Sequence, residues 1–113
     1  MLGSPYELRS DPAPFGDHEA AYLAARAREG RLLDVEQIRA LPAPPTPESA
    51  WEWRLRADSW LRFELLLGSR PRPLRALDVG CGIGWMTARL AQHCPNVLGI
   101  DVARPELERA AAA

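Results

Sequence analysis

The segment that most constrains the fold of this chain covers residues 76–101 and reads ALDVGCGIGWMTARLAQHCPNVLGID. Two short apolar runs, at 76–79 and 97–100, are separated by a glycine-rich loop and a segment of helical character. Strands that are apolar along most of their length are typical of parallel sheets, which are covered on both faces. The segment therefore predicts a strand–loop–helix–strand unit of the α/β class.

The loop after the first predicted strand has glycine at positions 80, 82 and 84, and Asp101 ends the second strand. In parallel sheets, ligands bind at the carboxyl ends of the strands, where glycine lets a ligand approach the backbone. Asp101 follows Gly80 at about the 20-residue spacing of acids that bind ribose. A carboxylate there can accept two hydroxyl hydrogen bonds, so the pattern predicts a site for a ribose-containing cofactor.

Two features indicate which ribose-containing cofactor suits the loop. Dinucleotide-binding loops have glycine at the first, third and sixth positions, whereas this loop has Trp85 at the sixth position. Asp78 precedes the loop, and its charge would repel a pyrophosphate by about 1 kcal/mol or more even in a water-like medium. The same charge would attract an ammonium or sulfonium group. These features favour a cofactor with ribose and positive charge but no phosphate, which describes S-adenosylmethionine.

The sequence DVGCGIG at 78–84 resembles the acidic-x-Gly-x-Gly-x-Gly signature of class I S-adenosylmethionine-dependent methyltransferases, and VLGID at 97–101 is similar to their second motif. This resemblance implies that Asp78 lies near the amino group of the methionine moiety. It also implies that Asp101 holds the ribose hydroxyls, that Val102 flanks the adenine and that Cys81 contacts the cofactor through its backbone. The candidate cofactor-binding residues are Asp78, Gly80, Cys81, Gly82, Gly84, Asp101 and Val102.

The family fold is a seven-stranded sheet with helices on both faces, and this chain supplies only its first two strands. The last residues, ELERAAAA, have helical character without a stop signal. We therefore expect an N-terminal fragment with a Rossmann-like parallel sheet that is truncated after the second strand and preceded by a helical segment. The acid that recognises adenine, the acceptor pocket and any general base would lie beyond Ala113, so the catalytic residues and the acceptor stay unassigned.

The residues before the glycine-rich unit predict a helical segment at 1–47. Proline and glycine interrupt residues 1–16, which predicts a loose arm. A helix is expected from about His18 to Glu29, with Asp17 as its cap and Gly30 at its end. A second short helix begins at Asp34, which forms a capping-box pattern with Gln37.

Residues 41–47 read LPAPPTP, which predicts a stiff, extended connector. We therefore divide the chain into an N-terminal arm with two helices and this connector, at 1–47, and an incomplete cofactor-binding domain at 48–113.

A longer helix is predicted to begin at Thr46-Pro47-Glu48 and to run to Leu67, before Gly68. Its buried stripe is predicted to consist of Trp53, Ala57, Trp60, Phe63 and Leu67. The helix corresponds in position to the one that precedes the first strand in the family. Arg54, Arg56 and Trp60 are therefore candidate contacts to the cofactor or the acceptor.

Composition narrows the class of partner. The chain has 113 residues and a net charge of −1, and it shows no basic face with interleaved aromatic residues, so the nucleic-acid signal is weak. Its longest aliphatic run, at 65–67, is too short to cross a membrane. Two cysteines without convergent histidines predict neither a disulfide framework nor a metal site, and they fit a cytoplasmic location.

Three functions stay open for this sequence. The leading hypothesis is the S-adenosylmethionine-binding part of a methyltransferase that acts on an unidentified acceptor, with a small molecule favoured. The first alternative is an NAD(P)-dependent Rossmann oxidoreductase, and the second is a non-catalytic Rossmann-like binding module.

Overall fold

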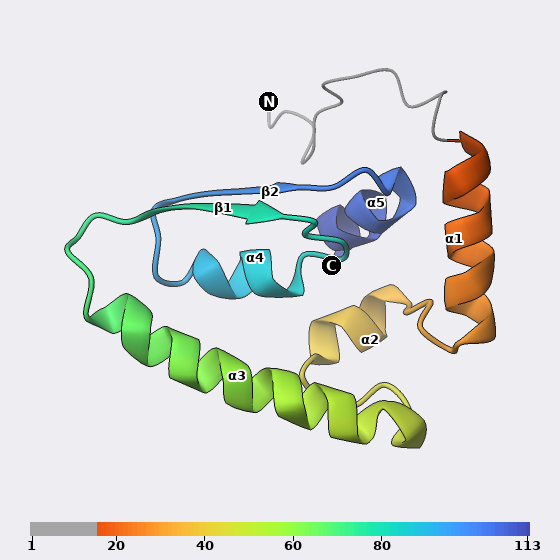
Figure 1. Cartoon of the computed structure of the whole chain (residues 1–113), viewed down its shortest axis with the longest axis horizontal. Coiled ribbons are helices and arrows are strands. Elements are labelled where there is room, and N and C mark those ends of the chain that lie inside the picture. The colour runs from red at the N-terminus through yellow and green to blue at the C-terminus, as the bar shows by residue number, and fades with distance from the viewer. Residues whose placement is uncertain (1–15) are drawn as a thin grey trace.

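The structure is a computed structural model that describes residues 16–113, so the arm expected at 1–16 lies almost wholly outside the described residues. A two-stranded sheet and its connecting helix form the C-terminal half, and a long helix and two shorter ones precede them (Figure 1). In chain order the elements are α1 (Gly16–Arg28), α2 (Val35–Ala40), the 3₁₀ turn η2 (Pro47–Ser49), α3 (Ala50–Gly68), β1 (Arg75–Val79), α4 (Trp85–Leu90), β2 (Asn96–Ile100) and α5 (Arg104–Ala112).

The two strands pair in parallel, as predicted, with Arg75 opposite Asn96 and Val79 opposite Ile100. Helix α4 lies between this sheet and α3 (Figure 1). A buried cluster joins the three layers: Trp60 and Leu67 come from α3, Leu90 comes from α4, and Ala76 and Val97 of the strands pack against them. The fold is therefore the opening of a Rossmann-like sheet with helices on one face.

The other face of the sheet carries apolar side chains that no described residue buries. Leu77, Val79 and Leu98 are 59%, 72% and 60% exposed, and Ile100 is also exposed. The expectation of strands buried on both faces therefore holds for one face only, because the side chains alternate along each strand and the described helices pack on one side.

The predicted start and end of the first helix are partly confirmed. Gly30 closes α1 in a left-handed conformation (φ +67°). Two hydrogen bonds, from the amide of Gly30 to the carbonyl of Ala27 and from Arg31 to Arg26, complete the glycine-based turn. Asp17 is not the cap, because α1 already begins at Gly16 and places Asp17 in its first turn. An acid in the first turn still interacts favourably with the helix dipole.

The second helix has the predicted capping box. The Asp34 carboxylate accepts a hydrogen bond from the Gln37 amide at 2.8 Å, and the Gln37 side chain accepts one from the Asp34 amide at 3.0 Å. The connector that follows is not extended: the amide of Ala43 bonds back to the carbonyl of Ala40, and Leu41 is buried. The reason is that Leu41 packs with Leu33 and Trp53 in a second core cluster, which turns the chain back.

Helix α3 follows a 3₁₀ turn that Thr46 and Ser49 cap reciprocally, close to the predicted start. Trp53, Trp60 and Leu67 form its buried stripe, and Ala57 is half-buried. Phe63 was expected in this stripe but is 40% exposed. It lies to the side of the stripe, where its ring packs against Trp60 with centroids 5.9 Å apart.

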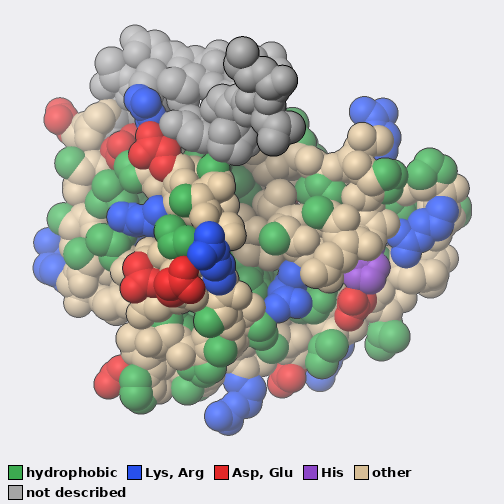
Figure 2. Space-filling view, turned by 180° about the vertical axis from the view of Figure 1, so that it is seen from behind, with side chains coloured by type: hydrophobic (Ala, Val, Ile, Leu, Met, Phe, Trp, Pro, Cys, Tyr) green, Lys and Arg blue, Asp and Glu red, His purple; other side chains and the backbone are tan. Residues whose placement is uncertain are grey.

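The surface of the described residues carries charges of both signs, interspersed over the face shown in Figure 2. Among residues 16–113, no helix combines the length and the apolar character that crossing a membrane would require. The segment 16–47 packs on the rest of the chain through the Leu33–Trp53 cluster and through α2, which contacts α5. The division of the chain at residue 47 stays a prediction.

We expect the 113-residue chain on its own to unfold without a sharp transition. Its two-stranded sheet exposes Leu77, Val79, Leu98 and Ile100 on one face, and an isolated strand pair is marginal in water. Thermal unfolding followed by circular dichroism should show helical signal lost over a broad range. A single steep transition would contradict this, because it would show that one covered face is enough.

Candidate functional site

The glycine-rich loop is fastened to the carboxyl end of β2. The backbone amides of Gly80 and Cys81 both donate to the carbonyl of Ile100, at 2.8 and 3.0 Å. The amide of Gly84 then closes a turn onto the carbonyl of Cys81 at 2.9 Å. The loop thus lies at the strand end at which ligands of parallel sheets bind.

All three loop glycines have positive φ angles, of +75° at Gly80, +52° at Gly82 and +76° at Gly84. The space that each missing side chain leaves has different neighbours. A Cβ at Gly82 would lie 2.9 Å from a carboxylate oxygen of Glu106, and one at Gly84 would lie 3.2 Å from Ala110. A Cβ at Gly80 would meet nothing within 4 Å. Among the three glycines, Gly80 therefore offers open space for a ligand, while Gly82 and Gly84 allow α5 to approach the loop.

Asp78 lies inside the strand end and holds α4. Its carboxylate accepts a hydrogen bond from the Thr87 hydroxyl at 2.7 Å. The Thr87 oxygen and the Cys81 sulfur both lie against Gly99 of β2, where a Cβ would come within 2.8 and 2.9 Å of them. Gly99 thus lets the first turn of α4 lie close to the sheet beneath the loop.

Asp101 organises the end of β2 with both carboxylate oxygens. One oxygen accepts from the amide of Gly82 at 2.8 Å, and the other accepts from the amide of Ala103 at 2.7 Å. A carboxylate has about four acceptor positions, so each oxygen retains one for a hydroxyl group. Gly80 and Asp101 line the same cavities, and the residues present therefore fit a ribose diol.

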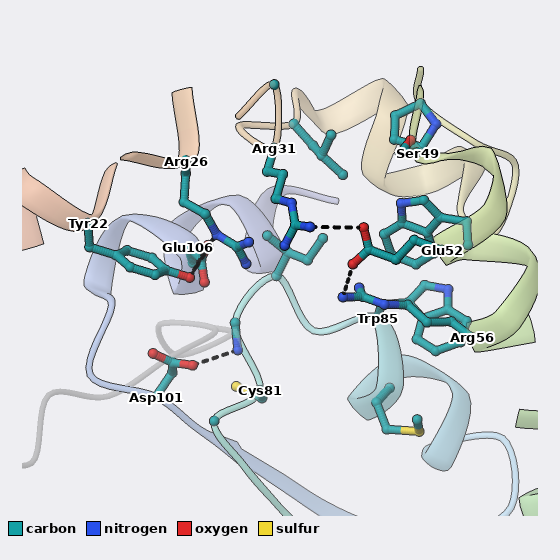
Figure 3. A pocket seen from close by; sticks show the side chains of 18 residues that line it. Tyr22, Arg26, Arg31, Ser49, Glu52, Arg56, Cys81, Trp85, Asp101 and Glu106 are labelled. Carbon is teal, nitrogen blue, oxygen red and sulfur yellow. Dashed lines mark hydrogen bonds and ion pairs between the residues drawn. The ribbon is translucent and has the colours of Figure 1, made fainter. Parts of the chain in front are cut away.

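Glu106 is a residue of this site that the sequence did not indicate. It is only 6% exposed and faces the loop from α5. The hydroxyl of Tyr22 donates to its carboxylate at 3.3 Å, and the guanidinium of Arg26 lies 3.8 Å away (Figure 3). In the sequence, Glu106 reads as an ordinary first-turn acid, and its burial depends on α1, which lies more than seventy residues earlier.

A cavity of about 290 Å³ lies between the glycine loop and the N-terminal helices. We name it the loop cavity. On one side it is lined by Tyr22, Arg26 and Glu106; on the other, Arg31 and Arg56 both pair with Glu52, at 3.3 and 2.6 Å (Figure 3). Its remaining wall includes Trp53 and Trp85, whose rings meet edge to face at 5.5 Å.

A second cavity, of about 620 Å³, lies at the strand ends and is named the strand-end cavity. It is lined by His18, Glu19, Tyr22, Val79, Gly80, Ile100, Asp101, Val102 and Ala103. Tyr22, Gly80 and Asp101 line both cavities. Five of the seven candidate residues line these cavities: Gly80 and Asp101 line both, Cys81 and Gly82 line the loop cavity, and Val102 lines the strand-end cavity. Asp78 and Gly84 line neither.

The remaining sequence candidates lie apart. Of the three residues proposed on α3, Arg56 lines the loop cavity, Trp60 is buried in the core, and Arg54 is exposed. Both cysteines are free; Cys94 is buried, while Cys81 is partly accessible. Burial, together with the nearby carboxylates of Asp101 and Asp78, raises the pKa of the Cys81 thiol.

We expect Cys81 to be a poor nucleophile at pH 8. A raised pKa lowers the fraction of thiolate, which is the reacting form. The rate of alkylation by iodoacetamide should therefore be lower than that of free N-acetylcysteine, and its dependence on pH should move to higher pH. Peptide mapping by mass spectrometry separates Cys81 from the buried Cys94. Alkylation of Cys81 faster than the free thiol would show that the thiol is activated rather than suppressed.

Comparisons with known proteins give matches to methyltransferases. Residues 76–113 match a family model described as a methyltransferase domain. An uncharacterized methyltransferase of Mycobacterium tuberculosis is 36% identical over 63 residues, which cover 56% of this chain and 30% of that protein. An uncharacterized methyltransferase of Mycobacterium bovis matches with the same figures. The chain thus spans about a third of the length of these curated relatives. No solved structure gives a significant match.

Proposed function

We propose that this chain, whose residues 76–113 match a family model described as a methyltransferase domain, is the S-adenosylmethionine-binding part of a class I enzyme that transfers a methyl group to a small-molecule acceptor. The observation that carries the proposal is the placement of the Asp101 carboxylate beside the open side of Gly80, at the carboxyl ends of two parallel strands. We also propose that the enzyme acts in the cytoplasm.

In this proposal, four of the candidate residues act on the cofactor. Asp101 accepts the ribose hydroxyls with the acceptor positions that its two backbone hydrogen bonds leave over. Val102 lies against the adenine in the strand-end cavity. Gly80 gives the cofactor access to the backbone, and Asp78 contributes a negative charge near the positive end of the cofactor. Bound S-adenosylmethionine would supply the methyl group on a sulfonium centre.

In this proposal, the chain contributes to the reaction by positioning the cofactor. Methyl transfer is an in-line attack, and much of its acceleration comes from orienting the two reactants. The loop is held by its bonds to Ile100 and Asp101. Tyr22 and Arg26 of α1 contact Glu106, which lies against Gly82 of the loop. These contacts favour a fixed cofactor geometry.

The alternative of an NAD(P)-dependent oxidoreductase is less well supported. At the sixth loop position, Trp85 begins α4 and packs against Trp53, so a bulky ring stands where dinucleotide-binding loops require glycine. The named relatives are methyltransferases. The alternative of a non-catalytic binding module differs from the proposed enzyme in one outcome. Such a module would bind the cofactor without transferring its methyl group.

In the full-length protein, Asp101→Ala should weaken S-adenosylmethionine binding by roughly 1.5–3 kcal/mol, the scale of a hydrogen bond to a charged group. Isothermal titration calorimetry measures the change. Unaltered affinity in a folded variant would show that Asp101 does not bind the ribose.

Asp34→Ala is the matched control, because Asp34 also caps a backbone amide through its carboxylate but lies at the N-cap of α2, outside both cavities. This variant should lose about 1 kcal/mol of stability and keep its cofactor affinity. If both variants lost affinity equally, the effect of Asp101→Ala would be a general loss of stability.

A further inference from the structure

The outer side of α3, opposite its buried stripe, carries apolar side chains that no described residue covers. Trp51, Leu55 and Leu65 are 66%, 59% and 79% exposed, and α3 lies along the edge of the molecule in Figure 1. Large apolar side chains on two opposite sides are typical of a helix that is packed on both of them. The outer side of α3 therefore indicates a surface that a further element covers.

The exposed side chains of this outer side recur at alternating steps of four and three residues. We name the following set the outer seam: Trp51, Leu55, Asp58, Arg62 and Leu65. Leu61 and Leu66, which are also exposed, flank it. Seven residues make about two turns of a helix, so the members of the outer seam lie in one row. This spacing is that of the a and d positions of coiled coils, which indicates that the covering element is another helix.

The two charged members of the outer seam determine which helix fits. Asp58 and Arg62 stand at its centre, with Leu55 before them and Leu65 after them. Both charged side chains are exposed, and neither forms an ion pair or a hydrogen bond among residues 16–113. An antiparallel copy of the seam would place Arg62 opposite Asp58 and Leu65 opposite Leu55. The outer seam is therefore complementary to itself, both in charge and in apolar character.

A parallel copy of the seam does not fit, because identical residues meet in a parallel pair. Asp58 would face Asp58 and Arg62 would face Arg62, and such like-charge contacts are costly. In an antiparallel pair, the two-fold axis instead repeats the contact between opposite charges, as in other symmetric dimers. Arg54, an exposed charge beside the seam, would then lie next to Leu61 of the copy and would meet no like charge.

We propose that α3 is a dimerisation helix, whose outer seam packs antiparallel against the outer seam of a second copy of this chain. Leu55 of each copy packs against Leu65 of the other, and Asp58 of each copy pairs with Arg62 of the other. A polar contact at the centre of an apolar seam fixes register and orientation at a cost in affinity. No member of the seam lines the loop cavity or the strand-end cavity, so this inference does not rest on the proposed function.

Sedimentation velocity of the full-length protein tests whether the dimer exists. We expect a reversible monomer–dimer equilibrium with a dissociation constant on the order of micromolar, because a short interface with a charged centre is weak. A protein that stays monomeric up to about 1 mM, the limit of weak association, would overturn the proposal. It would show that another part of the chain, or a different partner, covers the outer seam.

Charge reversals test the central contact. Asp58→Arg and Arg62→Asp should each weaken the dimer by more than about tenfold, because each variant brings like charges together across the two-fold axis. An equimolar mixture of the two variants should form a heterodimer about as tight as the wild-type dimer, because each arginine of one variant faces an aspartate of the other. Neither variant can pair opposite charges between positions 58 and 62 of its own helix. Restored association therefore reports a contact between copies.

Arg28→Asp is the matched control, because it reverses a charge at an exposed position of α1, and it should leave the dimer unchanged. An equal loss of association in this control would indicate a general effect of charge and would refute the seam. A mixture that stays monomeric would refute the contact between Asp58 and Arg62. A mixture that associates far more tightly than the wild-type protein would indicate a parallel pair and overturn the proposed orientation. Circular dichroism checks that every variant keeps the helical content of the wild-type protein.

Discussion

The structure of the site depends on the carboxylate of Asp101. This side chain joins the glycine loop, through the amide of Gly82, to the start of the segment that leads into α5, through the amide of Ala103. Together with the two loop amides that bond to the Ile100 carbonyl, it holds the loop in one conformation at the end of β2. One residue thereby combines an architectural task with the proposed contact to the ribose, because a carboxylate has more acceptor positions than two amides use.

The N-terminal helices complete this arrangement. Glu106 lies under the loop, at the place that the missing side chain of Gly82 leaves open, and its charge is balanced by Arg26 and Tyr22 of α1. Glu106 is buried and Arg26 lies 3.8 Å from it, so these contacts link α1 to the loop. The 290 Å³ cavity exists only because α1, α3 and the loop meet there. The helical segment before the sheet is therefore part of the site.

The sequence predicted the features that are encoded locally. The capping box of Asp34 and Gln37 and the closing turn at Gly30 depend on residues a few positions apart. The parallel strand pair joins residues 21 positions apart, within one short strand–loop–helix–strand unit. The features that it missed depend on distant packing. The burial of Glu106, the outward position of Phe63 and the bend after Leu41 are set by neighbours from other elements. For the same reason, the sequence suggested that all three glycines make room for a ligand, whereas two of them make room for α5.

The central claim is that the end of this sheet recognises S-adenosylmethionine rather than a dinucleotide. The most direct measurement is calorimetric titration of the full-length protein with S-adenosylmethionine and, separately, with NAD and NADP. The account predicts saturable binding of S-adenosylmethionine and no measurable binding of either dinucleotide, because Trp85 occupies the sixth loop position and Asp78 would repel a pyrophosphate. Tighter binding of NAD or NADP than of S-adenosylmethionine would contradict it.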